Sequence, residues 1–174
     1  MPEEKLITVE PYALLYTRAG AGVCLRDPLT GKVGVIFMEL PDGMALEQVL
    51  KGERPTRPDT SSLLAHLLSA MECRVRLVLI NGRKDEVFYA RVAVEAVNEV
   101  MEKLVELDAR PSDALMIAAR FGTGIKIIPP YGRAWKIFSP SLNNWRRTPW
   151  TAALRYMWLT CRRGNELLFH PDTA

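Results

Sequence analysis

The spacing of apolar residues along the chain predicts two helices. Residues 60–72 carry their large apolar side chains three and four positions apart, as a helix with one apolar face does. Asp59, directly before them, has a side chain of the type that caps a helix N-terminus. Residues 111–121 are mostly apolar and are followed by Gly122, the residue type that most often ends a helix. The apolar face of the first helix consists of Leu63, Leu64, Leu67, Leu68 and Met71.

Segments rich in β-branched and aromatic residues predict strands before the first helix. Residues 6–16 form a strand candidate that Pro11 interrupts. Residues 23–26 and 33–40 are predicted to pair across a turn at residues 27–31. The N-terminal part of the chain should therefore be mainly antiparallel sheet.

A further hairpin is predicted between the two helices. Residues 74–80 and 87–94 flank Asn81–Gly82, a dipeptide that favours a tight hairpin turn. In the second strand, Tyr89 and Arg91 alternate with apolar residues, so they should face away from the core. The apolar residues of that strand are Phe88, Ala90, Val92 and Val94.

Together these elements predict an α+β domain over residues 1–130, with a mixed, largely antiparallel sheet packed with helices. Residues 38–52 and 106–122 share the order strand, acidic turn and helix. An internal duplication of a strand–turn–helix unit is therefore a further hypothesis. Within the first of these units, residues 44–50 are expected to be the helix.

Residues 131–174 form a basic, tryptophan-rich C-terminal extension. Residues 148–162 are expected to form an amphipathic helix with Trp150, Leu154 and Trp158 on its apolar stripe. Such a stripe favours packing on the main domain or on a partner subunit. The arginines between the tryptophans also suit the alternative, in which the extension binds nucleic acid by stacking and phosphate contacts.

Charge is distributed unevenly along the 174 residues, although the net charge is only +3. Residues 131–174 hold seven Lys and Arg against two Asp and Glu, which gives +5, so the first 130 residues carry −2. Electrostatic attraction to nucleic acid is therefore indicated for the extension and not for the main domain.

The cysteines and the absence of long apolar runs indicate a compartment. The three cysteines, Cys24, Cys73 and Cys161, are scattered and form no CxxC pair, so disulfides and a zinc site are not expected. No signal peptide and no membrane span is apparent. A cytoplasmic protein without membrane contact is the expectation.

Candidate chemistry gathers just before the second helix, in Asp108-Ala109-Arg110-Pro111-Ser112-Asp113. Pro111 suits the first helical turn, and Asp113 then lies where a carboxylate complements the helix dipole. One interpretation is a capped helix start with a local ion pair. The other is an anion or phosphate site at the mouth of a groove, formed by free N–H groups and Arg110.

The same residues carry a family resemblance. The stretch from Asp108 to Ala114, followed by Ala118-Ala119-Arg120, resembles the signature of the bifunctional nuclease domain family. Arg57-Pro58-Asp59-Thr60 with Leu63-Leu64, and Val87-Phe88-Tyr89-Ala90-Arg91, agree with it in order and spacing, so the resemblance spans residues 33–130. One departure is Ser61, where relatives often carry histidine after the threonine.

The resemblance implies a nuclease that hydrolyses phosphodiester bonds of DNA and RNA. That chemistry needs an activated water and positive charge on the phosphate oxygens, usually from carboxylate-bound Mg²⁺ or Mn²⁺ together with Arg or Lys. The alternative is a non-enzymatic regulatory module that binds an anion or nucleic acid without cleaving it. Relatives also look like dimers, and the apolar helix 111–121 needs cover, so a homodimer or larger homo-oligomer is expected.

Candidate residues follow from residue type and position. Carboxylates can hold a metal or act as base, and arginines can clamp phosphate, although each also has a structural role available in capping or ion pairing. The candidate catalytic residues are Asp108, Arg110, Asp113 and Arg120, and the candidate binding residues are Arg54, Arg57, Ser112, Glu39 and Asp59.

Overall fold

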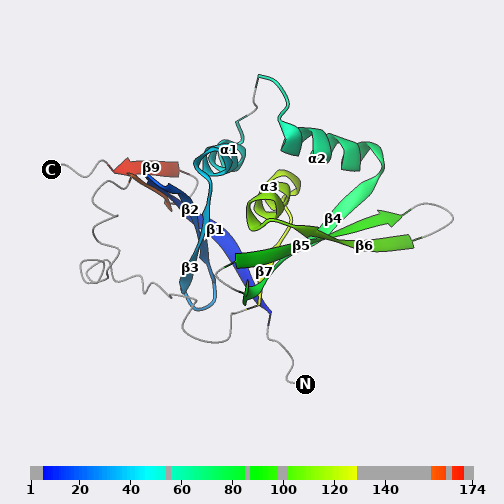
Figure 1. Cartoon of the computed structure of the whole chain (residues 1–174), viewed down its shortest axis with the longest axis horizontal. Helices are drawn as coiled ribbons and strands as arrows, with labels where there is room; N and C mark the ends of the chain where they lie inside the picture. The colour runs from blue at the N-terminus through cyan, green and yellow to red at the C-terminus, as the bar shows by residue number, and fades with distance from the viewer. Residues whose placement is uncertain are drawn as a thin grey trace. The chain divides into compact units, whose positions relative to one another are not determined.

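The computed structural model describes residues 6–53, 56–84, 87–97, 102–128, 158–163 and 166–170. Two compact units divide the chain. Unit 1 comprises Met1–Val9 and Ala45–Ala134, and unit 2 comprises Glu10–Met44 and Trp135–Ala174. Both contain strands and the first also contains two whole helices, so the predicted α+β class is confirmed (Figure 1).

Unit 1 is built on a mixed sheet. Among the strands that the structure describes, its only parallel pair joins β4 (Cys73–Lys84) to β7 (Ile125–Ile127), and the remaining pairs are antiparallel. The sheet order is the start of β1 (Ile7–Thr17), then β7 (Ile125–Ile127), β4 (Cys73–Lys84), β5 (Val87–Val97) and β6 (Glu102–Ala109).

Two helices pack on this sheet. α3 (Pro111–Phe121) lies against β4 and β5, and α2 (Thr60–Ala70) lies against α3 and β4 (Figure 1). The predicted start and end of α3 are confirmed, because Pro111 occupies its first turn and Gly122 follows it in the left-handed conformation at φ 62°. The core between α3 and the sheet includes Ala114, Leu115, Ala118, Val78, Ile80, Ala90, Val92 and Val94.

Strand alternation in β5 follows the prediction. Ala90, Val92 and Val94 are buried, whereas Tyr89 and Arg91 are exposed on the other face. The predicted turn at Asn81–Gly82 is wrong, because β4 continues to Lys84 and pairs with Val87. Asn81 instead lies at a register irregularity within the strand, where a favoured turn dipeptide is accommodated without ending the pairing.

Unit 2 is an antiparallel sheet in the order β3 (Val33–Met38), β2 (Gly20–Arg26), β1, β8 (Trp158–Arg163) and β9 (Glu166–His170). The predicted pairing of β2 with β3 across residues 27–31 is confirmed. Asp27 holds this turn, since its carboxylate accepts hydrogen bonds from the backbone N–H groups of Leu29 and Thr30. The register of β1 shifts between Pro11 and Ala13, as the interruption by proline predicted.

Residues 158–162 were expected to end an amphipathic helix, and this part of the prediction is wrong. They belong to β8, in which Trp158 pairs with Tyr16 and Cys161 with Ala13. Backbone pairing with β1 satisfies their N–H and C=O groups in a way that apolar periodicity alone does not reveal. Residues 148–157, which include Trp150 and Leu154, lie outside the described residues, as do the residues around the predicted boundary at 130.

α1 (Leu40–Leu50) begins four residues earlier than predicted, with only Glu39 between it and β3. Pro41 and Asp42 therefore belong to its first turn. Backbone N–H groups there have no acceptor within the helix, so a proline loses no hydrogen bond, and a carboxylate complements the helix dipole. β3 with α1 and β6 with α3 share one order, but the duplication itself stays a prediction. No helix in the described ranges is long and apolar enough to cross a membrane.

Candidate functional site

The connection from β6 to α3 places three of the candidate residues close together in the chain. Arg110 is the N-cap residue of α3 in an extended conformation, φ −67° and ψ 148°, and its side chain makes no capping hydrogen bond. Pro111 fixes the next backbone angle, so strand β6 changes into helix over a single residue. Asp113 falls in the first turn of α3.

Arg110 and Asp113 form a bidentate ion pair. The Nε of Arg110 donates to Oδ2 of Asp113 at 2.7 Å, and Nη2 donates to Oδ1 at 3.0 Å. Their side chains are 61% and 53% exposed. An exposed pair of this kind stabilises a protein by less than about 1 kcal/mol, so the guanidinium can exchange Asp113 for another anion at small cost.

Asp108 lies on the exposed face of β6, directly opposite Arg91 of β5. Arg91 donates from Nη1 to Oε2 of Glu106 at 2.9 Å, and that pair is more than half exposed. Across the part of the chain that the structure describes, no hydrogen bond or ion pair engages the Asp108 carboxylate. The β6–α3 junction, defined here by Arg91, Glu106, Asp108, Arg110 and Asp113, therefore presents carboxylates and guanidiniums to solvent.

A second cluster forms where the end of α3 meets the start of α2. Arg120 donates from Nη2 to both carboxylate oxygens of Asp59, at 2.9 and 3.1 Å, and from Nε to Oγ of Ser61 at 2.9 Å. Ser61 in turn donates to Oδ1 of Asp59 at 2.9 Å. The Arg120 side chain is only 14% exposed, which distinguishes this α2–α3 cluster from the solvated pair at Arg110.

Asp59 is also the N-cap of α2, as predicted, since its Oδ1 accepts a hydrogen bond from the backbone N–H of Ser62 at 2.7 Å. Burial acts to raise the pKa of Asp59. The hydrogen bonds from Ser62 and Ser61 and the positive charge of Arg120 outweigh burial, and together they lower the pKa below its ordinary value. The Asp59 carboxylate is thus committed to holding α2 and Arg120.

The four candidate catalytic residues fall at the two ends of α3. Arg110 precedes the helix and Arg120 belongs to its last turn, and eleven helical residues span about 16 Å. Asp108, Arg110 and Asp113 belong to the β6–α3 junction, whereas Arg120 belongs to the α2–α3 cluster with its guanidinium already engaged. A single site that uses all four residues is therefore not what the helix geometry favours.

The candidate binding residues are spread further. Ser112 is partly buried in the first turn of α3, and Arg57 is exposed before α2. Glu39 is exposed in unit 2, where its carbonyl oxygen accepts a hydrogen bond from Gly43 N–H at the start of α1. Arg54 lies outside the described residues.

The positions of the potential metal ligands test whether the described residues could hold the expected divalent cation. Among the described residues no group of three or more His, Cys, Asp or Glu side chains is placed to hold a metal ion. Mg²⁺ in phosphoryl-transfer sites is often held by one or two carboxylates together with water and phosphate oxygens. The described residues thus do not fit a protein cage for Mg²⁺ or Mn²⁺.

Two members of the β6–α3 junction and one of the α2–α3 cluster were not among the sequence candidates. Alternation in β5 placed Arg91 on the exposed face, but only the strand register brings Asp108 opposite it. Ser61 had been noted only as a departure from relatives, and its contact with Arg120 joins residues 59 positions apart. Pairings over such sequence distances leave no local pattern.

Comparison with known proteins agrees with this part of the chain. Residues 23–129 match the family described as the bifunctional nuclease domain. Bifunctional nuclease 1 of Oryza sativa subsp. japonica is 29% identical over 108 residues, which are 55% of this chain and 32% of that protein. Bifunctional nuclease 1 of Arabidopsis thaliana is 29% identical over 93 residues, which are 53% of this chain and 28% of that protein.

An uncharacterized protein of Mycobacterium tuberculosis is 32% identical over 84 residues, which are 48% of this chain and 46% of that protein. The match thus covers about a third or less of each plant relative and under half of the mycobacterial one. The family match itself includes both β6 and α3, the two elements that carry Asp108 and Arg110. The chain belongs to the bifunctional nuclease domain family.

Proposed function

We propose that this chain hydrolyses phosphodiester bonds of DNA and RNA at the β6–α3 junction. The observation that carries the proposal is an exposed carboxylate, Asp108, in a matched nuclease domain, which lies opposite the exposed Arg91 in the sheet and two residues before the exposed Arg110 in the chain. Phosphodiester hydrolysis needs a base for the attacking water and positive charge near the phosphate oxygens, and these residue types supply both.

Each residue has a defined part in this proposal. Asp108 takes the proton of the attacking water. Arg110 leaves its exposed pair with Asp113 and donates to two phosphate oxygens, the geometry for which a guanidinium is suited. Arg91 supplies a second cation from the neighbouring strand. The positive end of the α3 dipole stabilises the negative charge of the phosphate.

The test is cleavage of fluorescently labelled single-stranded DNA and RNA by the full-length chain, with and without EDTA. Asp108→Asn should lower the cleavage rate about a hundredfold or more, as loss of a general base does. Glu53→Gln, which changes an exposed carboxylate elsewhere, is the matched control and should leave the rate unchanged. Equal rates for Asp108→Asn and the unchanged chain would contradict the proposal.

A non-enzymatic role is the second candidate, and one observation favours it. The N-terminus of α3 has no side-chain cap, so its N–H groups and Arg110 can bind an anion without cleaving it. Oligonucleotide binding that Arg110→Ala weakens, with no cleavage at any metal concentration, would support this regulatory module over the nuclease.

Two further proposals concern context. We propose a cytoplasmic location, which the free thiols of Cys24 and Cys73 support, because a reducing compartment keeps thiols unpaired. We also propose that the chain forms a homodimer or larger homo-oligomer. The apolar helix that first suggested this, α3, is largely buried within unit 1, so a different surface must provide the contact.

A further inference from the structure

α2 exposes the face that its sequence predicted to be buried. Leu63, Leu64, Leu67 and Met71 are 64%, 41%, 53% and 63% exposed. The one buried residue of the helix is Ser62, a polar side chain. A contiguous set of large exposed apolar side chains on a folded domain is typical of an interaction surface.

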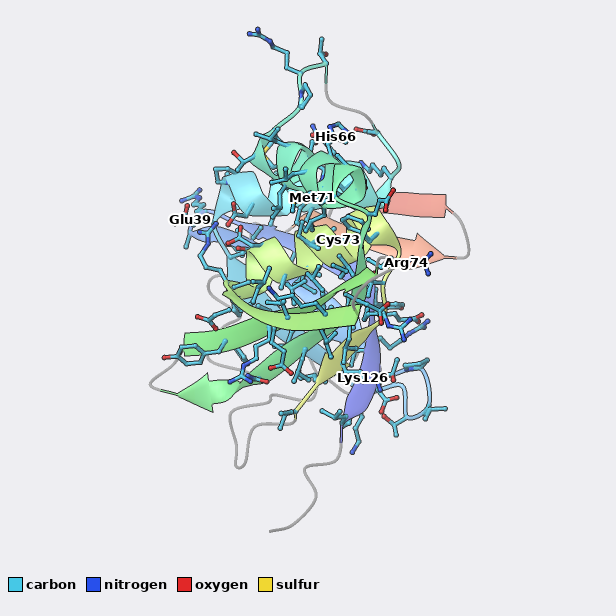
Figure 2. All side chains as sticks on the ribbon, turned by 90° about the vertical axis from the view of Figure 1, so that its right-hand side faces the viewer. Glu39, His66, Met71, Cys73, Arg74 and Lys126 are labelled. Carbon is cyan, nitrogen blue, oxygen red and sulfur yellow. The ribbon has the colours of Figure 1, made fainter. Side chains whose placement is uncertain are left out.

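These side chains form one continuous stripe, the α2 face. Leu63, Leu67 and Met71 are four residues apart, so they lie one above another along the helix over about 12 Å, with Leu64 beside them. Figure 2 views the side of the molecule that carries α2 and labels Met71 just past its C-terminal end and His66 along it. The stripe has the pattern of a helix that packs against another helix.

The orientation of α2 is fixed at both ends, so the helix cannot simply rotate to bury its leucines. Its N-terminal end is held by the Asp59 cap and by Arg120, which is only 14% exposed. Its C-terminal end is joined to β4 by Met71 and Glu72 alone, and the Met71 N–H donates to Leu67 O at 3.0 Å, which closes the helix there. Rotation would break the α2–α3 cluster and expose Ser62, so the exposed stripe is a stable property of unit 1.

The charge of α2 indicates what covers the stripe. From Thr60 to Ala70 the helix contains no Asp, Glu, Lys or Arg. In a two-fold contact each surface meets a copy of itself, so any charge near the axis would face a like charge. An uncharged apolar stripe avoids that repulsion. Nucleic acid, in contrast, requires cations at its binding surface, and this helix has none.

We propose that the α2 face is the contact surface for a second copy of this chain, with two α2 helices packed antiparallel about a two-fold axis near Leu67. The antiparallel arrangement opposes the two helix dipoles, whereas a parallel one would place like ends together. Leu67 then packs against its own symmetry mate, and Leu63 of each copy lies near Met71 of the other. The proposal gives the homodimer a surface and does not depend on nuclease activity.

The test is the molar mass of the full-length chain by light scattering and sedimentation across micromolar concentrations. The unchanged chain should be a dimer, and Leu67→Glu should raise the dimer dissociation constant about tenfold or more, because two carboxylates would face each other at the axis. Leu29→Glu is the matched control, since Leu29 is 93% exposed in the β2–β3 turn, and it should dimerise normally.

The outcomes separate cleanly. Monomeric Leu67→Glu with an unchanged circular dichroism spectrum supports the proposal. A dimer that persists in Leu67→Glu overturns the proposal, and so does an unchanged chain that is monomeric. If the unchanged chain is monomeric and Leu67→Glu lowers its melting temperature, another segment of the same chain covers the stripe. If Leu67→Glu does not fold, Leu63→Ala/Leu67→Ala decides by the same criterion. An unchanged chain that dimerises but cleaves neither DNA nor RNA would reject the nuclease proposal alone.

Discussion

Arg120, in the last turn of α3, is held by both carboxylate oxygens of Asp59, the residue that caps α2. The two residues are 61 positions apart in the chain. One carboxylate thus accepts from a free N–H group of one helix, that of Ser62, and from the guanidinium of another, which fixes the start of α2 against the end of α3. Ser62, whose N–H donates to Asp59, is the buried member of α2.

Arg120→Ala should destabilise the protein far more than Arg110→Ala. Loss of Arg120 leaves a partly buried carboxylate without its cation, and the partial exposure of Asp59 limits the loss in unfolding free energy to about 1–3 kcal/mol. Arg110 is in a solvated pair, so its loss should change the free energy by less than about 1 kcal/mol. Urea denaturation of both variants measures the difference, and equal values would contradict the structural role of Arg120.

The lowered pKa of Asp59 predicts a pH dependence of stability. Because its pKa in the folded protein lies below the unfolded value of about 3.9, its contribution is fully present above that pH and is lost as pH falls through the folded pKa. Asp59→Asn keeps a capping oxygen but removes the charge that pairs with Arg120. The unchanged chain should melt at a higher temperature than Asp59→Asn at pH 7, and this difference in melting temperature should shrink below about pH 4. A constant gap across this range would show that the charge contributes nothing.

Arg110→Ala should weaken binding of a phosphate-bearing ligand while leaving the fold intact. The guanidinium is exposed and its local pair is weak, so binding energy and not stability should carry the loss. Fluorescence anisotropy with a labelled oligonucleotide measures the affinity, and Arg26→Ala, which removes another exposed, ion-paired arginine, is the control. A large loss of stability with unchanged affinity would identify the pair as structural only.

Gly43→Ala should destabilise unit 2. A Cβ at Gly43 would overlap the Cβ of Ala21 on β2, so α1 and β2 would have to separate. Such overpacking lowers the unfolding free energy by about 1–3 kcal/mol. Replacing a helical glycine by alanine usually raises it by only about 0.5–1 kcal/mol, so the net effect should be a loss of stability. Gly124→Ala, where an added Cβ meets nothing within 4 Å, is the control. Thermal melting that ranks the two variants in the opposite order would contradict the close approach of α1 and β2.

The accuracy of sequence analysis depended on how local each determinant is. Pro111 and Gly122 mark the ends of α3 because each acts on its own backbone angles, and both predictions were confirmed. The Asn81–Gly82 turn failed because pairing between strands extended to Lys84 and Val87, a gain that the dipeptide does not report. The apolar face of α2 was recognised, but its exposure was not, because the helix is oriented by the contact of Asp59 with Arg120, far away in the chain.

The site shows the same limit. Residue types near Pro111 indicated an anion site, and the pairing of Arg110 with Asp113 was expected from their spacing. That Arg120 would be engaged by Asp59, and that Arg91 would lie opposite Asp108, depends on tertiary and sheet register contacts. Local chemistry therefore predicted which residues carry charge but not which of them share a surface.

The C-terminal extension provides the last prediction, because β8 pairs with β1 and also carries part of the positive charge. Cutting the chain after Pro130 removes β8, so β1 from Ala13 to Tyr16 keeps its pairing with β2 but becomes an open edge on its other side. The truncated protein should melt earlier or aggregate, since an exposed strand edge pairs with other chains. It should also lose salt-dependent affinity for oligonucleotides if the seven Lys and Arg of residues 131–174 contact phosphates.

A single substitution separates these two effects. Thr160 pairs with Leu14 inside the ladder, and β8 has a strand on either side, so Thr160→Pro removes a backbone donor without changing any charge. If β8 acts as a structural strand, Thr160→Pro should lower the melting temperature much as truncation does while most oligonucleotide affinity remains. If the extension acts through its charge, Thr160→Pro should melt and bind like the unchanged chain, and only truncation should reduce binding. We expect the first result, because a proline in the middle of a three-strand ladder breaks the pairing on which β8 depends.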